Sequence, residues 1–179
     1  PIHLELKPDV KPYHAKPYPV PFSQEKKLRD ELDRFIAWKI LRKVNRSEWG
    51  APMFTISKPD GSLRSLADLR ELNKRIKRKP FPIPKIQDML HKLIGFQWVT
   101  TIDLNMGYHN ILLDSHSQKL CTIVLPWGKY EYLSLPGAGL CNAPGIFLEK
   151  TAELMEDFDY VRAYIDDVLV LQVVPLRIT

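Results

Sequence analysis

Two adjacent carboxylates, Asp166 and Asp167, interrupt the last β-rich stretch of the sequence, residues 160–174. Side chains alternate between the two faces of a strand, so a continuous strand would send the two acids to opposite faces. Charges among apolar residues are costly unless they are exposed or neutralised. A tight hairpin with both acids near its tip avoids this cost. The stretch therefore predicts two strands that are joined at the acidic pair.

A third acid, Asp103, lies at the end of another apolar β-rich run, within residues 98–104. If the two strands are neighbours, three carboxylates meet, and they repel one another unless divalent cations fill the space. Carboxylate oxygens suit Mg²⁺, and two such ions about 3.5–4 Å apart can activate an attacking oxygen and stabilise a leaving one. A simple polar turn is the commoner explanation of an isolated Asp-Asp pair. The predicted metal-binding and catalytic residues are Asp103, Asp166 and Asp167, with two Mg²⁺ ions or, alternatively, Mn²⁺.

Predicted helices and strands alternate along the rest of the sequence, which indicates an α+β fold. Apolar residues recur at helical spacing from Ser23, the expected N-cap, to about Lys43. The turn residues Pro59-Asp60-Gly61 predict a hairpin. Five prolines within residues 7–21 forbid a helix and predict an extended arm over the surface. The expected helices are 23–43, 84–95 and 144–158, and the expected strands are 51–57, 63–66, 98–104, 121–125 and 130–135.

Composition and charge narrow the class of protein. Hydrophobic residues make up 45% of the 179 residues, enough for a core, and no apolar run approaches the roughly 20 residues that span a bilayer. Cys121 and Cys141 show neither metal nor disulfide spacing, which fits an intracellular compartment such as the nucleus or a cytoplasmic particle. Lys and Arg are in excess in residues 1–92, and Asp and Glu in residues 93–179. This asymmetry is expected if phosphates bind one part and metal ions the other, although an ordinary uneven surface would also produce it.

Five motifs occur in the order and spacing of one protein family. They are D-L-R-E-L-N at 68–73, D-L-N-M-G-Y-H at 103–109, W-G-K-Y-E-Y at 127–132, G-L-C-N-A-P at 139–144 and Y-I-D-D at 164–167. With these motifs, residues 2–171 resemble the reverse transcriptase of gypsy-type LTR retrotransposons and, more distantly, of retroviruses. The resemblance implies an α+β fold of reverse-transcriptase fingers and palm, with an antiparallel sheet and packed helices.

The resemblance also implies a division of the chain and an activity. We expect a proline-rich arm at 1–22, a fingers-like region at 23–95 and a palm-like region at 96–179 that is incomplete, with no thumb or RNase H. The implied activity is that of an RNA-directed DNA polymerase, which transfers a nucleotide from a dNTP to a primer 3′-hydroxyl. The implied partners are an RNA or DNA template with its primer, dNTPs and other protein subunits.

Roles at the nucleotide site follow from the same resemblance. Asp103, Asp166 and Asp167 correspond to the metal-binding acids of the family. Lys58 and Arg64, which flank the predicted hairpin turn, correspond to the residues that hold the incoming triphosphate. A hairpin tip can close an ammonium and a forked guanidinium over phosphates, so this role is physically reasonable.

Sugar selection and template binding are implied in the same way. Tyr108 corresponds to the aromatic residue under the sugar, where a ring can exclude a 2′-hydroxyl by contact. Asp68, Arg70 and Asn73 match the segment of the family that lies near the templating strand. The basic run that follows them can contact backbone phosphate without reading sequence. A solvated linker is an equally good interpretation of this run. The predicted nucleic-acid contacts are Asp68, Arg70, Asn73, Lys74, Arg75, Lys77 and Arg78.

One departure from the family pattern concerns the loop Gly137-Ala138-Gly139, which carries an additional residue before the family's glycine. We expect this insertion to displace the loop beside the nucleotide base. The first alternative hypothesis is therefore an inactive, truncated or repurposed fragment that serves as a structural or binding subunit of a larger complex. A second alternative, another two-metal enzyme such as a nuclease, keeps the acids but does not explain the fingers-like segment.

Overall fold

The computed structural model describes residues 1–57, 59, 63–80, 98–137, 139–158, 160–164 and 167–172. The chain divides into two compact units that interleave in sequence. Unit 1 comprises Pro1–Arg78 and Tyr108–Ala143, and unit 2 comprises Lys79–Gly107 and Pro144–Thr179. From the sequence we expected a single boundary between residues 95 and 96. The two units instead interleave, because segment 108–143 supplies strands to the sheet of unit 1.

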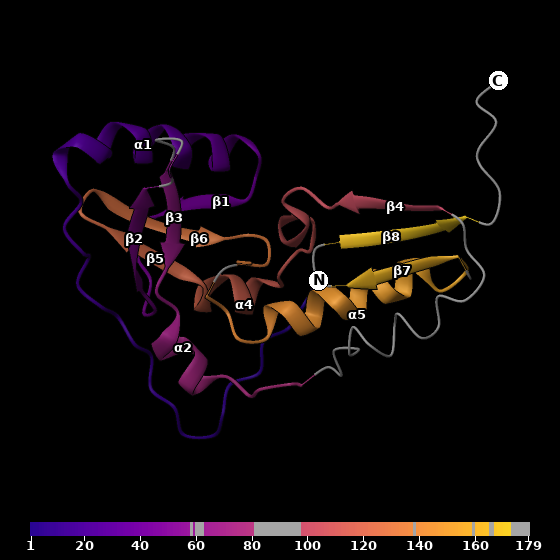
Figure 1. Ribbon diagram of the computed structural model, residues 1–179. Coiled ribbons are helices and arrows are strands. Elements are labelled where there is room, and N and C mark those ends of the chain that lie inside the picture. The colour runs from indigo at the N-terminus through magenta and orange to yellow at the C-terminus, as the bar shows by residue number, and fades with distance from the viewer. Residues whose placement is uncertain are drawn as a thin grey trace. The chain divides into compact units, whose positions relative to one another are not determined.

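Unit 1 is built on a five-stranded sheet with the order β1-β6-β5-β2-β3 (Figure 1). Neighbouring strands are antiparallel except β2 and β5, which are parallel, so the sheet is mixed rather than wholly antiparallel. Its strands are β1 (Leu41–Val44), β2 (Ala51–Ser57), β3 (Leu63–Ala67), β5 (Thr122–Leu125) and β6 (Gly128–Tyr132). The α+β class and the hairpin of β2 and β3 are as the sequence predicts.

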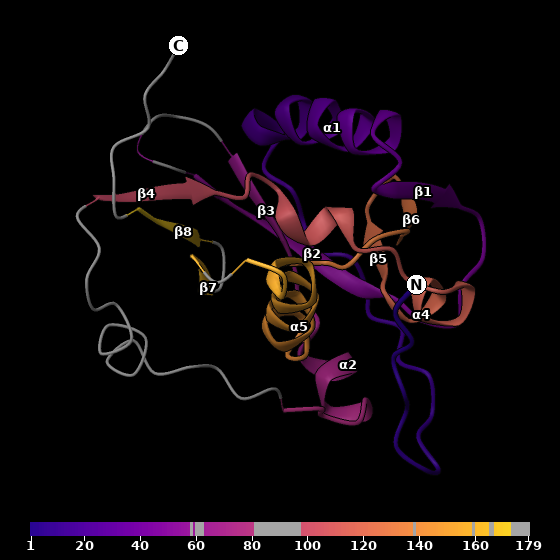
Figure 2. The same ribbon diagram turned by 90° about the vertical axis from the view of Figure 1, so that its right-hand side faces the viewer.

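Helix α1 (Phe22–Ala37) lies over this sheet in both views (Figures 1 and 2). Its buried residues, Leu28 and Leu32, are one helical turn apart and form the face that packs inward. The short helices of the unit are α2 (Arg70–Arg75) and α4 (Ser115–Leu120), and the 3-10 helix η1 covers Gly107–Asn110.

The predicted helix at 23–43 is wrong at both ends. Pro21, not Ser23, is the N-cap, and no side chain caps the helix there. The helix ends at Ala37, and Lys39 adopts a left-handed φ of 57° that turns the chain into β1. Ile40 is buried at 5% exposure and β1 pairs with β6, so sheet pairing overrides the helical spacing that the sequence shows beyond Ala37.

The first 21 residues form no helix or strand, as the proline content predicts. They lie along unit 1 through isolated bridges, Ile2 with Leu113 and His14 with Gly50. Backbone hydrogen bonds secure them, including Ala15 N to Gly50 O at 2.8 Å. The arm is therefore an ordered part of unit 1.

Unit 2 contains a three-stranded antiparallel sheet with the order β4-β8-β7. Its strands are β4 (Trp98–Asp103), β7 (Val161–Tyr164) and β8 (Asp167–Gln172), and its helix is α5 (Ala143–Met155). Strands β7 and β8 form the predicted hairpin, with Tyr164 opposite Asp167. The predicted helix at 84–95 lies outside the described residues. Within the ranges that the structure describes, no helix is long and apolar enough to cross a bilayer.

Candidate polymerase active site

The strand register of unit 2 brings two of the three predicted acids together. Asp103 is the last residue of β4 and Asp167 is the first of β8, and the two residues are direct partners in the antiparallel pair. Side chains of direct partners project from the same face with Cβ atoms roughly 4.5–5.5 Å apart. Both acids are exposed. Asp166 lies outside the described residues.

Strand alternation explains why Asp167 faces solvent. Val168 follows Asp167 in β8 and is buried at 3% exposure, so the pleat turns the Asp167 side chain to the other face. The apolar residues behind the acid therefore fix its direction.

This donor pair suits a hydrated divalent cation. Two like charges directly opposite each other destabilise a sheet, and a bound cation removes that repulsion. Magnesium prefers carboxylates from the protein together with waters and substrate phosphates, which exposed side chains allow. The part of the chain that the structure describes contains no group of three His, Cys, Asp or Glu residues able to hold a metal. The third predicted acid, Asp166, is not among these residues.

The predicted nucleotide-binding residues of unit 1 lie on its hairpin and on η1. Arg64 is exposed on β3, where it pairs with Ile56 of β2. Lys58 lies outside the described residues. Tyr108 is half-buried in η1 and its ring lies against Gly137.

Asp68 and Arg70 form a fixed pair at the start of α2. The Arg70 guanidinium donates from Nε to Asp68 Oδ1 at 2.8 Å and from Nη2 to Oδ2 at 2.7 Å. Tyr18 of the arm donates to the same carboxylate at 3.0 Å. The hydrogen bonds from Arg70 are the main reason that the pKa of Asp68 falls to about 2. Asp68 therefore orients Arg70, whose side chain is 80% exposed.

A hollow of about 450 Å³ opens beside this pair. Phe54 is 40% exposed within its lining, and Arg70 lies at the same hollow. Aromatic rings and guanidinium planes are the groups on which unstacked bases are held. The lining residues are Phe54, Leu66, Ala67, Asp68, Leu69, Arg70 and Gly139.

Asn73 holds the loop that contains the additional residue. Its amide nitrogen donates to Gly139 O at 2.7 Å, and its amide oxygen accepts from Cys141 N at 2.9 Å. Gly139 has a φ of +97°, and an added Cβ would lie 2.7 Å from Ala67 O, so backbone and space both require glycine. Gly139, which the resemblance matches to a glycine of the family, thus has a defined position.

The basic run that begins in the last turn of α2 is largely paired with acids. Lys74 and Arg75 contact Glu71 at 2.6 and 2.7 Å, and Lys77 contacts Glu5 at 3.2 Å. Arg78 is exposed. The pairs of Lys74 and Lys77 are largely exposed and contribute little stability, so these two cations can exchange a carboxylate for a phosphate at low cost. Arg75 is held more firmly, because it also donates to Lys11 O and Glu71 O.

The family is shown by comparison with known proteins. A model of the family described as reverse transcriptase (RNA-dependent DNA polymerase) matches residues 56–173, more than half of the chain. This chain belongs to the reverse transcriptase family. It is 30% identical over 166 residues to the retrovirus-related Pol polyprotein from transposon 297 of Drosophila melanogaster, covering 89% of this chain and 16% of the relative. It is 28% identical over 155 residues to the transposon Tf2-3 polyprotein of Schizosaccharomyces pombe, covering 86% and 12%.

Solved structures of reverse transcriptases share the fold. A mutant prototype foamy virus protease-reverse transcriptase superposes with a TM-score of 0.81 at 25% identity, over 90% of this chain and 22% of that one. A foamy viral protease-reverse transcriptase in complex with double-stranded DNA gives 0.80 at 22% identity, over 90% and 28%, and so supports the fold alone. This reverse transcriptase chain thus spans less than a third of each of these proteins.

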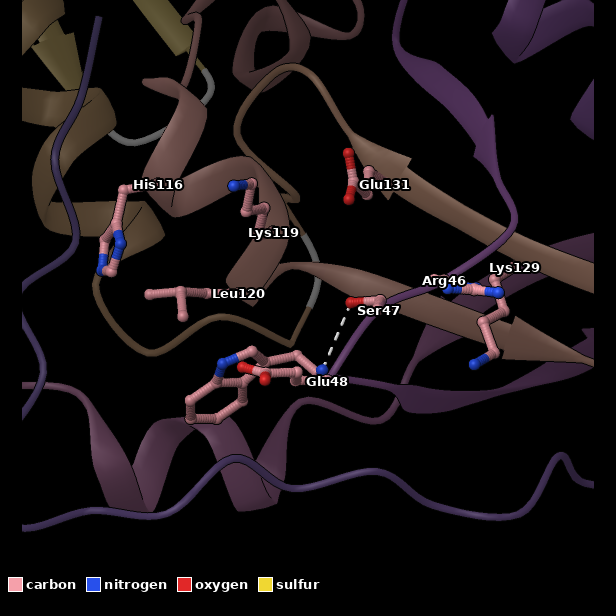
Figure 3. Close-up of a pocket in the computed structure, with 9 residues that line it drawn as sticks. Arg46, Ser47, Glu48, His116, Lys119, Leu120, Lys129 and Glu131 are labelled. Atoms are coloured by element: carbon pink, nitrogen blue, oxygen red, sulfur yellow. Dashed lines mark hydrogen bonds between the residues drawn. The ribbon is translucent and has the colours of Figure 1, made fainter.

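A second hollow of the reverse transcriptase chain, about 580 Å³, contains none of the predicted site residues. Figure 3 shows Lys119 on one side of it and Lys129 on the other, with Glu48 and Glu131 also in the lining. Glu131 is paired with Arg42 at 2.8 Å. The lining of this hollow therefore mixes basic and acidic side chains.

Sequence reasoning missed three residues that shape the site: Tyr18, His109 and Gly137. His109 stacks on Tyr132 at 6.4 Å between ring centroids, and burial lowers its pKa. Its position within the G-Y-H motif was the available signal. Nothing in the sequence marks Tyr18, which acts through the distant residue Asp68. The sequence singles out Gly137 only as part of the altered loop, and its contact with Tyr108 depends on the fold.

Proposed function

We propose that this chain is the fingers and palm of an RNA-directed DNA polymerase of a gypsy-type LTR retrotransposon. It would transfer a nucleotide from a dNTP to the 3′-hydroxyl of a primer on an RNA or DNA template. The register that sets Asp103 opposite Asp167 is the observation that carries the proposal. An exposed acid pair at two strand ends, in a chain of this family, is arranged for divalent-metal chemistry.

Asp103, Asp166 and Asp167 would hold two Mg²⁺ ions, or Mn²⁺. When bound, the ions would lower the pKa of the primer hydroxyl and stabilise the departing pyrophosphate. Asp103 and Asp167 would do this from neighbouring backbone positions, so the ordered sheet sets their separation.

The other predicted residues would bind and orient the substrates. Lys58 and Arg64 would hold the triphosphate, and Tyr108 would exclude a 2′-hydroxyl. Arg70, oriented by Asp68, would contact the template nucleotide at the 450 Å³ hollow. The phosphate backbone would be contacted without sequence reading by Lys74, Arg75, Lys77 and Arg78, while Asn73 would contribute by holding the adjacent loop.

Primer extension tests the proposal directly. The 179-residue chain would be given an RNA template, a DNA primer, all four dNTPs and Mg²⁺. We expect extension that falls by about 10³-fold or more in Asp166→Asn and Asp167→Asn, since each removes a metal ligand. Asp157→Asn, at an exposed acid after α5, is the matched control and should leave extension unchanged. Extension that survives the ligand substitutions would refute the two-metal assignment.

One observation favours the alternative of a non-catalytic binding subunit: the additional residue in the loop at 137–139. Fluorescence anisotropy with a labelled primer–template separates the two functions. Binding that persists without any extension, at the same level in the wild-type chain and in Asp167→Asn, would support the alternative.

A further inference from the structure

The loop from Leu135 to Cys141 is fixed at both ends. At its start, Leu135 N donates to Ile111 O at 2.8 Å. At its end, Asn73 bonds to Gly139 O and Cys141 N. Leu135, Gly139 and Cys141, on either side of Gly137, are therefore each held by a hydrogen bond within unit 1.

Gly137 lies within this loop and touches the predicted sugar-selecting residue. A Cβ built on Gly137 would lie 2.9 Å from Cγ, 3.0 Å from Cδ2 and 3.2 Å from Cβ of Tyr108. Carbon atoms in contact normally lie about 3.5–4.0 Å apart, so any side chain at 137 would push the tyrosine. Gly139 has a positive φ, whereas Gly137 does not. Space for Tyr108, rather than backbone conformation, is therefore what requires glycine at 137.

The helix that carries Tyr108 is also held, through its neighbour His109. The His109 ring lies against Phe35, at 5.7 Å between ring centroids, and stacks on Tyr132. The backbone at 108–109 thus cannot readily retreat, and a side chain at 137 would displace the Tyr108 ring itself.

We propose that Gly137 is a positioning residue, which sets the place of the Tyr108 ring and thereby the discrimination between deoxynucleoside and ribonucleoside triphosphates. This inference rests on the proposed function, because it takes the sugar contact of Tyr108 from there.

Single-nucleotide incorporation on a primer–template tests this role. We expect Gly137→Ala to change the ratio of kcat/KM for dNTP over rNTP by at least about threefold, since a displacement well below 1 Å already affects a contact-based selection. Gly128→Ala is the matched control, because a Cβ there meets its nearest atom at an ordinary 3.6 Å. In a Tyr108→Ala background, Gly137→Ala should produce no further change in the ratio.

Two results would overturn the inference. One is a ratio in Gly137→Ala that equals that of Gly128→Ala. The other is an equal change with and without the Tyr108 ring. If Gly137→Ala fails to fold, the double variant with Tyr108→Ala should fold, because the overlapping ring is gone; a double variant that also fails to fold would show that the contact is not the cause.

A spectroscopic readout keeps this test separate from the proposed function. The chain has 7 tyrosines, and incorporation of 3-fluorotyrosine gives each a ¹⁹F resonance, with Tyr108→Phe identifying that of Tyr108. We expect Gly137→Ala to shift this resonance and Gly128→Ala to leave it in place. If the chain has no extension activity but the resonance shifts, the proposed function is refuted, while the contact between Gly137 and Tyr108 is supported. An unshifted resonance would refute the positioning role even in an active enzyme.

Discussion

The two sheets of the molecule differ in how they are covered. In unit 1 all four residues of β5 are buried, whereas in unit 2 all six residues of β4 are exposed. Strand β5 has a hydrogen-bonded neighbour on each side, β6 and β2, while β4 bonds to β8 alone within the described sheet. The difference separates two environments: β5 lies within a packed core, whereas the exposed edge strand β4 leaves Asp103 open to solvent, as the proposed metal binding requires.

The first prediction compares the same substitution in both sheets. Ile123 of β5 is 0% exposed and Ile102 of β4 is 47% exposed. Ile123→Ala should lower the free energy of unfolding by about 3 kcal/mol, because it leaves a cavity in a packed core. Ile102→Ala should cost about 1 kcal/mol or less, since its side chain already contacts water. Urea denaturation measures both values.

Equal losses of unfolding free energy in Ile123→Ala and Ile102→Ala would contradict the difference between the two sheets. Hydrogen exchange resolved by peptide provides the control, because it reports β4 and β5 separately. Faster exchange in β5 after Ile102→Ala would mean that the two sheets unfold as one cooperative body.

The sequence predicts the parts of this arrangement that depend on residues close together along the chain, and it misses those that depend on residues far apart along it. The acid hairpin follows from local alternation and turn requirements, and the pairing of β7 with β8 on either side of the acidic pair confirms the two predicted strands. The end of α1 was not, because β1 exists only through its pairing with β6, which lies far along the chain. The same holds in the site: motif spacing singles out Tyr108, whereas its contact with Gly137 depends on how a distant loop returns.

The second prediction concerns how unit 1 holds its loop. Asn73→Ala removes the hydrogen bonds to Gly139 O and Cys141 N, and should cost about 1–2 kcal/mol of unfolding free energy. Asn45→Ala, at an exposed asparagine of the same unit, should change stability by less than about 0.5 kcal/mol. Exchange should rise in residues 135–141 and stay constant in β4 and β8. A uniform rise across both units would contradict a local clamp.

The third prediction concerns the effect of pH on the free energy of unfolding through the buried side chain of His109. Burial lowers the pKa of His109 below its ordinary value of 6.5, so the unfolded chain takes up the proton first as pH falls. The stability from neutral His109 is complete above pH 6.5 and is lost as pH falls from there toward the lowered folded pKa. Between about pH 7.5 and about pH 5, the wild-type chain should therefore lose more unfolding free energy than His109→Gln, which stays neutral. Identical losses in the two proteins would show that His109 does not contribute.

The smallest expected effect, and the sharpest for unit 2, is a gain of stability. Asp103→Asn removes one of two like charges that lie directly opposite each other on an exposed edge, so without divalent ions unfolding free energy should rise by about 0.5 kcal/mol. Adding Mg²⁺ should stabilise the wild-type chain, because binding to the folded state alone favours it, and should stabilise the variant less. Asp157→Asn should respond to Mg²⁺ as the wild type does. If Asp103→Asn were destabilising without metal, the acid would serve the packing of β4, and the division between a supporting sheet and a reactive edge would not hold.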